Sequence, residues 1–213
     1  MRYLVERMRG SGGIKRSYLY SLDDTIAFYI RSAGGYSGLT QRQEQAGLYK
    51  NLLNSQYRAE IGSIRHALRR SGEYYEERFE TGIGSDYYYL VWSVKRLQFL
   101  IKKAGLRPVA RAVKPMLPLV NLRGITKKGL AAARHNPSPI ILAEIPFTGA
   151  GLTILDGNHR LISRGERGDV TVDCFVLPPE LHKRAMMGEL FRYLFNFNTN
   201  INSALHPGQY AGQ

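Results

Sequence analysis

The feature that most constrains the fold is a short apolar run that ends in an aspartate and a glycine. Residues 152–155 (LTIL) have the length and character of a strand, and Asp156 and Gly157 follow at once. The next residues, from Asn158 to about Gly165, carry a helical pattern. Since only two residues separate strand from helix, we expect the unpaired backbone N–H groups of the first helical turn to face one spot.

Such a spot attracts phosphate, and its side chains fit that chemistry. Gly157 has no side chain to keep a ligand away from the backbone, and Asn158 can cap the helix. Arg160 offers a forked donor to phosphate oxygens, while His159 can donate a hydrogen bond or exchange a proton near neutral pH. Asp156 can orient His159 or receive the proton of an attacking water. An ordinary capped turn is the alternative interpretation of the junction alone.

The first half of the chain is predicted to be helical. Residues 1–16 read as a loose arm, and a short helix over residues 22–32 is expected with Ser21 as its cap. Apolar residues at helical spacing predict a long helix from about Thr40 to residue 71 and another over residues 86–104. Residues 1–105 are therefore assigned to a helical N-terminal region.

Prolines near residue 106 mark a change to alternating strands and helices. We expect a mixed α/β core over residues 106–195 and an irregular tail over residues 196–213, so the predicted class is α+β. The strands expected in the core are 116–122, 140–147, 152–155 and 170–177, and the helices are 126–135, 158–165 and 179–194.

The charge points to a polyanionic partner. Thirty Lys and Arg residues stand against 17 Asp and Glu, a net charge of +13. DNA is the first candidate, and an acidic protein is the alternative. Four basic residues flank the expected phosphate site and are candidates for contacting nucleic acid, although a solvated helix face explains some of them equally well: Arg123, Lys127, Lys128 and Arg134.

Other features indicate a cytoplasmic protein. No stretch approaches the roughly 20 apolar residues of a membrane span. The single cysteine, Cys174, excludes an intramolecular disulfide and lies in an apolar run, where an inert buried thiol is expected.

The segment Asp156–Arg160 (DGNHR) resembles the DGxHR signature of the ParB/sulfiredoxin superfamily. The flanking stretches PSPIILAEIPF and VTVDCFVL are similar to that family's strand and hairpin before the motif and its strand after it, so about a third of the chain is covered. The resemblance implies a ParB/sulfiredoxin-like core that binds a nucleotide, ATP or CTP, with Asp156 and His159 as catalytic residues. An N-terminal helical region before such a core is similar to the plan of plasmid fertility-inhibition factors such as Osa, which implies a plasmid or phage role with NTPase or DNase activity.

Several departures from the family narrow the implied activity. Sulfiredoxins carry a nucleophilic cysteine where this chain has Asn158, so their repair chemistry is disfavoured. Partitioning ParB proteins carry a Gly-Glu-Arg-Arg box here and a helix-turn-helix domain afterwards, for which the remaining residues are too few. No early glutamate matches the catalytic one of the free-serine kinases.

A divalent ion is the remaining cofactor that the sequence suggests. Asp156 and Glu144 are the best carboxylates for Mg²⁺, because nucleotide phosphates and water complete its shell, although a solvent-facing strand position explains Glu144 as well. Three functions stay open: a nucleotide-binding protein that engages DNA and hydrolyses a phosphoryl or phosphodiester bond, a small-molecule kinase, and a catalytically silent interaction module.

Overall fold

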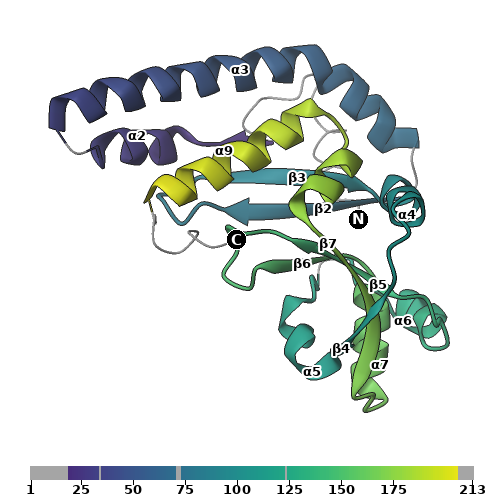
Figure 1. Ribbon diagram of the computed structural model, residues 1–213. Coiled ribbons are helices and arrows are strands. Elements are labelled where there is room, and N and C mark those ends of the chain that lie inside the picture. Colours follow the sequence, from purple (N-terminus) through teal and green to yellow (C-terminus); the bar gives the residue numbers. More distant parts are fainter. Residues whose placement is uncertain (1–18, 34, 71–72, 123, 206–213) are drawn as a thin grey trace. The chain divides into compact units, whose positions relative to one another are not determined.

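The computed structural model describes residues 19–33, 35–70, 73–122 and 124–205, and it contains helices and two small sheets (Figure 1). The predicted α+β class is therefore confirmed. The expected arm over residues 1–16 and Arg123 lie outside the described residues. Two compact units divide the chain, and we call them the helical unit (3–72, 76–91 and 186–213, where described) and the sheet unit (73–75 and 92–185, where described). The boundary expected near residue 106 stays a prediction.

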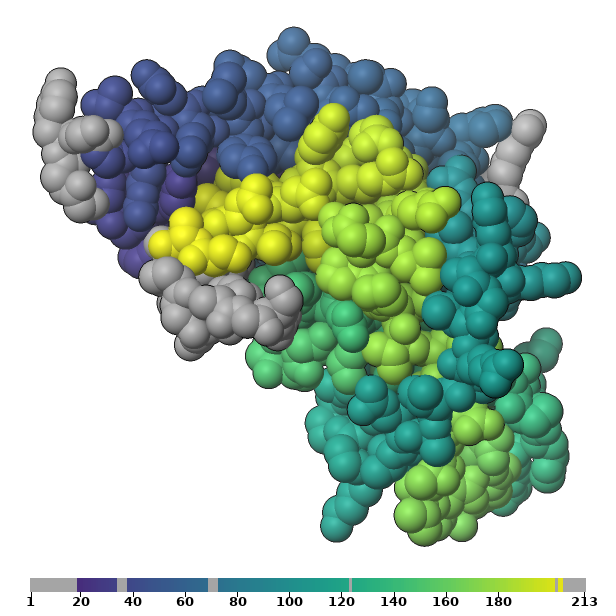
Figure 2. All heavy atoms as spheres, viewed as in Figure 1, coloured from purple at the N-terminus to yellow at the C-terminus, as the bar shows by residue number. Residues whose placement is uncertain are grey.

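One long helix organises the helical unit. Helix α3 (Gly35–Arg70) packs against α2 (Asp23–Arg31) and α9 (Glu189–Leu205), and Figures 1 and 2 show α9 lying along α3. Its buried residues Leu53, Ile64 and Leu68 recur at helical spacing, which is why the sequence predicted this helix. Among the described helices, none is both long and apolar enough to cross a membrane.

A three-stranded sheet replaces part of the predicted helices. Its order is β1-β3-β2. The helix expected over residues 86–104 is wrong in its first half, because the aromatic and β-branched run YYYLVWS forms strand β3. The charged run that precedes it in the chain forms strand β2. The helix begins only after Ser93, whose Oγ accepts the Arg96 N–H at 3.3 Å. The bounds are β1 Tyr20–Ser21, β2 Tyr74–Glu80, β3 Tyr87–Ser93 and α4 Val94–Lys103.

A buried carboxylate caps α2 in place of the expected Ser21. Asp86 is 3% exposed, and its Oδ2 accepts the Thr25 N–H at 2.7 Å in the first turn of the helix. Ser21 does not cap; its Oγ donates to Asp86 Oδ1 at 2.8 Å. A residue 61 positions away along the chain therefore satisfies this helix end.

The predicted closing helix over residues 179–194 is interrupted, and the predicted irregular tail is partly helical. At the start of helix α9, the backbone N–H groups of Glu189 and Leu190 donate to the two carboxylate oxygens of Glu60, at 3.0 and 2.9 Å. The helix continues to Leu205 because Phe197 and Ile201 extend its buried face. Before it stand α8 Pro179–His182 and the 3-10 turn η3 Lys183–Ala185.

The sheet unit contains a four-stranded sheet of order β4-β7-β5-β6. Strand β5 runs parallel to β7 and forms an antiparallel hairpin with β6. The strand expected over residues 116–122 is wrong, because Pro115 and Pro118 lack the N–H that a ladder needs. The strands are β4 Val109–Ala112, β5 Ile140–Glu144, β6 Leu152–Asp156 and β7 Thr171–Leu177; the helices are α5 Val113–Met116, η2 Leu117–Leu119, α6 Lys127–Ala133 and α7 Asn158–Glu166.

The core of the sheet unit joins this sheet to α5 and α7. Cys174 is fully buried in it, as expected, and burial raises the pKa of its thiol to about 11. Elsewhere in the unit, His182 is also fully buried: its Nδ1 accepts the Trp92 indole N–H at 3.3 Å, and its Nε2 lies 2.9 Å from the Glu144 carbonyl oxygen. Since an indole only donates and a carbonyl only accepts, we assign the proton to Nε2. Both side chains are therefore structural.

Candidate phosphate-binding site

The junction of β6 and α7 has the backbone form that the sequence predicted. Gly157 occupies the N-cap position with φ of 111°, a conformation that favours glycine, and it supplies no side-chain cap. The first helical hydrogen bond runs from the Leu161 N–H to the Gly157 carbonyl at 2.9 Å. The N–H groups of residues 158–160 therefore have no acceptor within the helix.

Asn158 does not cap the helix, contrary to expectation. It is the first residue of α7, and its Oδ1 accepts the Asn121 N–H at 3.0 Å. This bond ties the loop after η2 to the start of α7. The loop is thus part of the site, although no local sequence pattern around Asn121 predicted this contact.

Arg160 lies folded back over the glycine. Its Nη2 donates to Asp156 Oδ2 at 2.9 Å, and only 12% of its side chain is exposed. Its Nε is buried and has no hydrogen-bond partner among the described residues. A Cβ at Gly157 would lie 3.1 Å from Nη2 and 3.2 Å from Nε, so the absence of a side chain there lets the guanidinium approach the turn.

His159 is held by the first turn of α6. Its Nε2 accepts the Thr126 N–H at 3.2 Å, and burial lowers the pKa of its imidazole. A Cβ at Gly129 would lie 2.3 Å from Nε2, so Gly129 makes room for the ring. Since Nε2 accepts, we assign the proton of the neutral ring to Nδ1, where it is a hydrogen-bond donor.

Sequence reasoning missed the roles of Thr126 and Gly129. Thr126 is the N-cap of α6, and its Oγ1 accepts the Gly129 N–H at 3.0 Å. A Thr before a short helical pattern is a cap signal that was available in the sequence. Its contact with His159, 33 residues away, was not.

The two carboxylates proposed for Mg²⁺ are not brought together. In the hairpin, Asp156 pairs with Ile141 and Glu144 pairs with Leu152. Three residue steps along β5 separate the two positions, a distance of about 10 Å. Glu144 is also exposed, and the part of the chain that the structure describes contains no group of three or more His, Cys, Asp or Glu residues that fits a metal ion. Of the two carboxylates, only Asp156 lies at the junction of β6 and α7.

The basic residues predicted to contact nucleic acid are exposed where the structure describes them. Lys127 and Lys128 lie in the first turn of α6, where cations oppose the helix dipole, and Arg134 lies at its C-cap. Arg123 lies outside the described residues. Their exposure permits contact with a polyanion.

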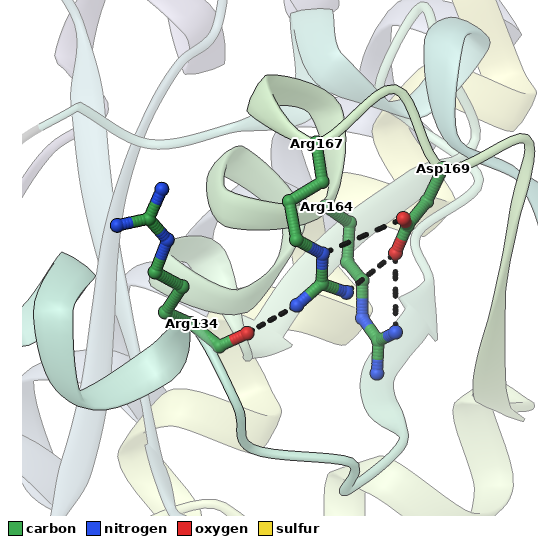
Figure 3. A network of polar contacts seen from close by, with 4 residues as sticks. All are labelled: Arg134, Arg164, Arg167 and Asp169. Atoms are coloured by element: carbon green, nitrogen blue, oxygen red, sulfur yellow. Dashed lines mark hydrogen bonds and ion pairs between the residues drawn. The ribbon is translucent and has the colours of Figure 1, made fainter.

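Two further arginines, missed in the sequence, meet at the other end of α7 (Figure 3). Arg164 Nη1 and Arg167 Nη2 both donate to Asp169 Oδ2, at 3.1 and 2.5 Å, and Arg167 also donates to the Arg134 carbonyl. The hydrogen bonds from Arg167 and then Arg164 lower the pKa of the Asp169 carboxyl. We call Arg134, Arg164 and Arg167 the arginine cluster.

Comparison with known proteins assigns no family to this chain. No family model, no curated protein and no solved structure matches it. We therefore infer the function from the residues of this chain.

Proposed function

We propose that this protein binds a nucleotide, ATP or CTP, through its phosphates at the junction of β6 and α7. The carrying observation is Arg160, which lies against the open first turn of α7 with a buried Nε that no described residue accepts from. A phosphate there receives N–H groups of the first turn and the guanidinium donors that Asp156 leaves free.

His159 supports the same proposal as a donor. Its Nε2 is engaged by Thr126, so Nδ1–H is the group available to a phosphate oxygen. Taking up a proton at Nε2 would break the bond to Thr126. Of the two roles that the sequence suggested for His159, the arrangement therefore favours hydrogen bonding over proton exchange.

Asp156 is the carboxylate of the proposed site. Its Oδ2 positions Arg160, and its side chain is 30% exposed, so it can also face a Mg²⁺ ion held by the nucleotide. Hydrolysis of a phosphoryl or phosphodiester bond is the reaction that this set of groups suggests. DNA is the proposed second partner, on the basis of the net charge of +13.

Membership of the ParB/sulfiredoxin superfamily is part of this proposal. The observed order of hairpin β5-β6, junction, α7 and β7 is the order that the resemblance implied. It supports the proposal because the DGNHR residues run from the last residue of β6 to the first turn of α7.

A nucleotide panel tests the function. We expect ATP or CTP with Mg²⁺ to raise the melting temperature, and phosphate release to accompany it. Asp156→Asn should lower turnover far more than nucleotide affinity, whereas His159→Ala should weaken binding. Nucleotide binding without phosphate release, for every nucleotide in the panel, would indicate a catalytically silent regulatory module. Transfer of phosphate to a small-molecule hydroxyl would indicate a kinase, and no binding at all would refute the proposal.

A further inference from the structure

Positive charge is concentrated in the sheet unit. Between Asp86 and Glu144 the chain carries eleven Lys and Arg residues and no Asp or Glu. All but Arg123 of these are described, and they are exposed. They are Lys95, Arg96, Lys102, Lys103, Arg107, Arg111, Lys114, Arg123, Lys127, Lys128 and Arg134. An excess of exposed cations of this size attracts polyanions.

The arginine cluster adds donors that are held in place, those of Arg164 and Arg167. Asp169 pairs with Arg164 and Arg167, so one carboxylate stands against the three guanidinium groups of the cluster, which keeps an excess of positive charge. The held side chains lose less rotational freedom on meeting a phosphate than free ones do. Figure 3 shows the Arg134 guanidinium directed away from Asp169, and no described residue forms an ion pair with it.

We propose that the arginine cluster is a second anion site, which contacts the phosphodiester backbone of a nucleic acid. It lies at the end of α7 opposite the nucleotide junction, and the nine residues of the helix span about 13 Å. A planar guanidinium fork matches phosphate oxygens and carries no base specificity, so binding is largely independent of sequence. This inference rests on the DNA-binding part of the proposed function and names its residues.

Arg134→Gln is the main test variant, because this side chain is exposed and supports no described ion pair. Arg58→Gln is the matched control: it removes one exposed arginine from α3, in the helical unit. Both variants have the same net charge. A difference between them therefore reports the position of the charge and not its total.

The experiment measures the affinity for a duplex oligonucleotide at several salt concentrations. Log affinity falls with log salt, and Arg134→Gln should make this slope shallower by about 0.9. The double variant Arg134→Gln with Arg164→Gln should make it shallower by about 1.8, while Arg58→Gln leaves it unchanged. Urea unfolding of each variant checks the fold. Equal slopes for Arg134→Gln and Arg58→Gln would overturn the proposal in favour of a diffuse field, as would absence of binding at low salt.

Two further measurements separate the possible causes of failure. In the first, poly-glutamate competes with the bound oligonucleotide. If it displaces the oligonucleotide as effectively as DNA of equal charge does, the partner is an acidic protein and the nucleic-acid assignment is overturned. The nucleotide-induced melting shift, measured on the same preparations, should persist in Arg134→Gln and disappear in Arg160→Ala. Loss of the nucleotide shift in the wild-type protein would refute the nucleotide site while leaving the arginine cluster to be judged by its salt slope.

Discussion

Gly157→Ala should destabilise the protein more than the substitution of a glycine whose added Cβ meets no neighbouring atom. A left-handed backbone costs a non-glycine residue about 1–2 kcal/mol, which applies to Gly105, whose φ is 62°. The backbone cost is larger at Gly157, whose φ of 111° lies outside the region that residues with a side chain adopt. A Cβ at Gly157 would in addition lie 3.0 Å from Ile140 Cγ1 and 3.1 Å from Arg160 Nη2, whereas one at Gly105 meets no atom within 4 Å. Forcing these two side chains away from the added Cβ costs about 1–3 kcal/mol more.

The assay is urea unfolding of Gly157→Ala beside Gly105→Ala. We expect losses of about 2–5 and about 1–2 kcal/mol in the free energy of unfolding. Because the Cβ displaces the guanidinium, Gly157→Ala should also weaken nucleotide binding about tenfold, while Gly105→Ala binds normally. Equal destabilisation and equal nucleotide affinity in the two variants would refute the close approach of Arg160 to the turn.

Two further predictions concern the buried polar groups. Asp86→Asn should lower the free energy of unfolding by about 2 kcal/mol, because the amide cannot accept from both Ser21 and Thr25; an unchanged urea midpoint would contradict this. Burial lowers the pKa of His182 to about 4, so the unfolded state binds more protons below pH 6.5, and stability should fall by about 3 kcal/mol as the pH drops from 6.5 to 4. His182→Gln should lack this part of the pH dependence, and an unaltered profile in that variant would rule the explanation out.

Local features were predictable from the sequence, and distant contacts were not. The junction at Gly157 was found because strand, glycine and helix are adjacent in the chain. The Asn-rich tail was expected to be irregular, but burial of Phe197 and Ile201 overrides its weak helix propensity, and the Asn198 and Thr199 side chains donate to carbonyls four residues earlier.

In the candidate site, too, local features were predictable from the sequence and contacts between distant residues were not. The residues of the DGNHR segment were identified, but their partners were not, because Asn121 and Thr126 reach them across 37 and 33 residues. The capping role given to Asn158 was wrong for this reason: its oxygen is used by the loop at Asn121. Only the folded arrangement shows that Nε2 of His159 is already engaged.

The most direct test of the central claim is the calorimetric affinity of wild type, Arg160→Ala and Arg58→Ala for ATP and CTP in Mg²⁺. Loss of a charge-assisted hydrogen bond is worth about 1.5–3 kcal/mol, so Arg160→Ala should bind roughly tenfold to a hundredfold more weakly. Arg58→Ala, which removes an exposed arginine on α3, should bind like the wild type. Normal nucleotide affinity in Arg160→Ala would contradict the phosphate site at the start of α7.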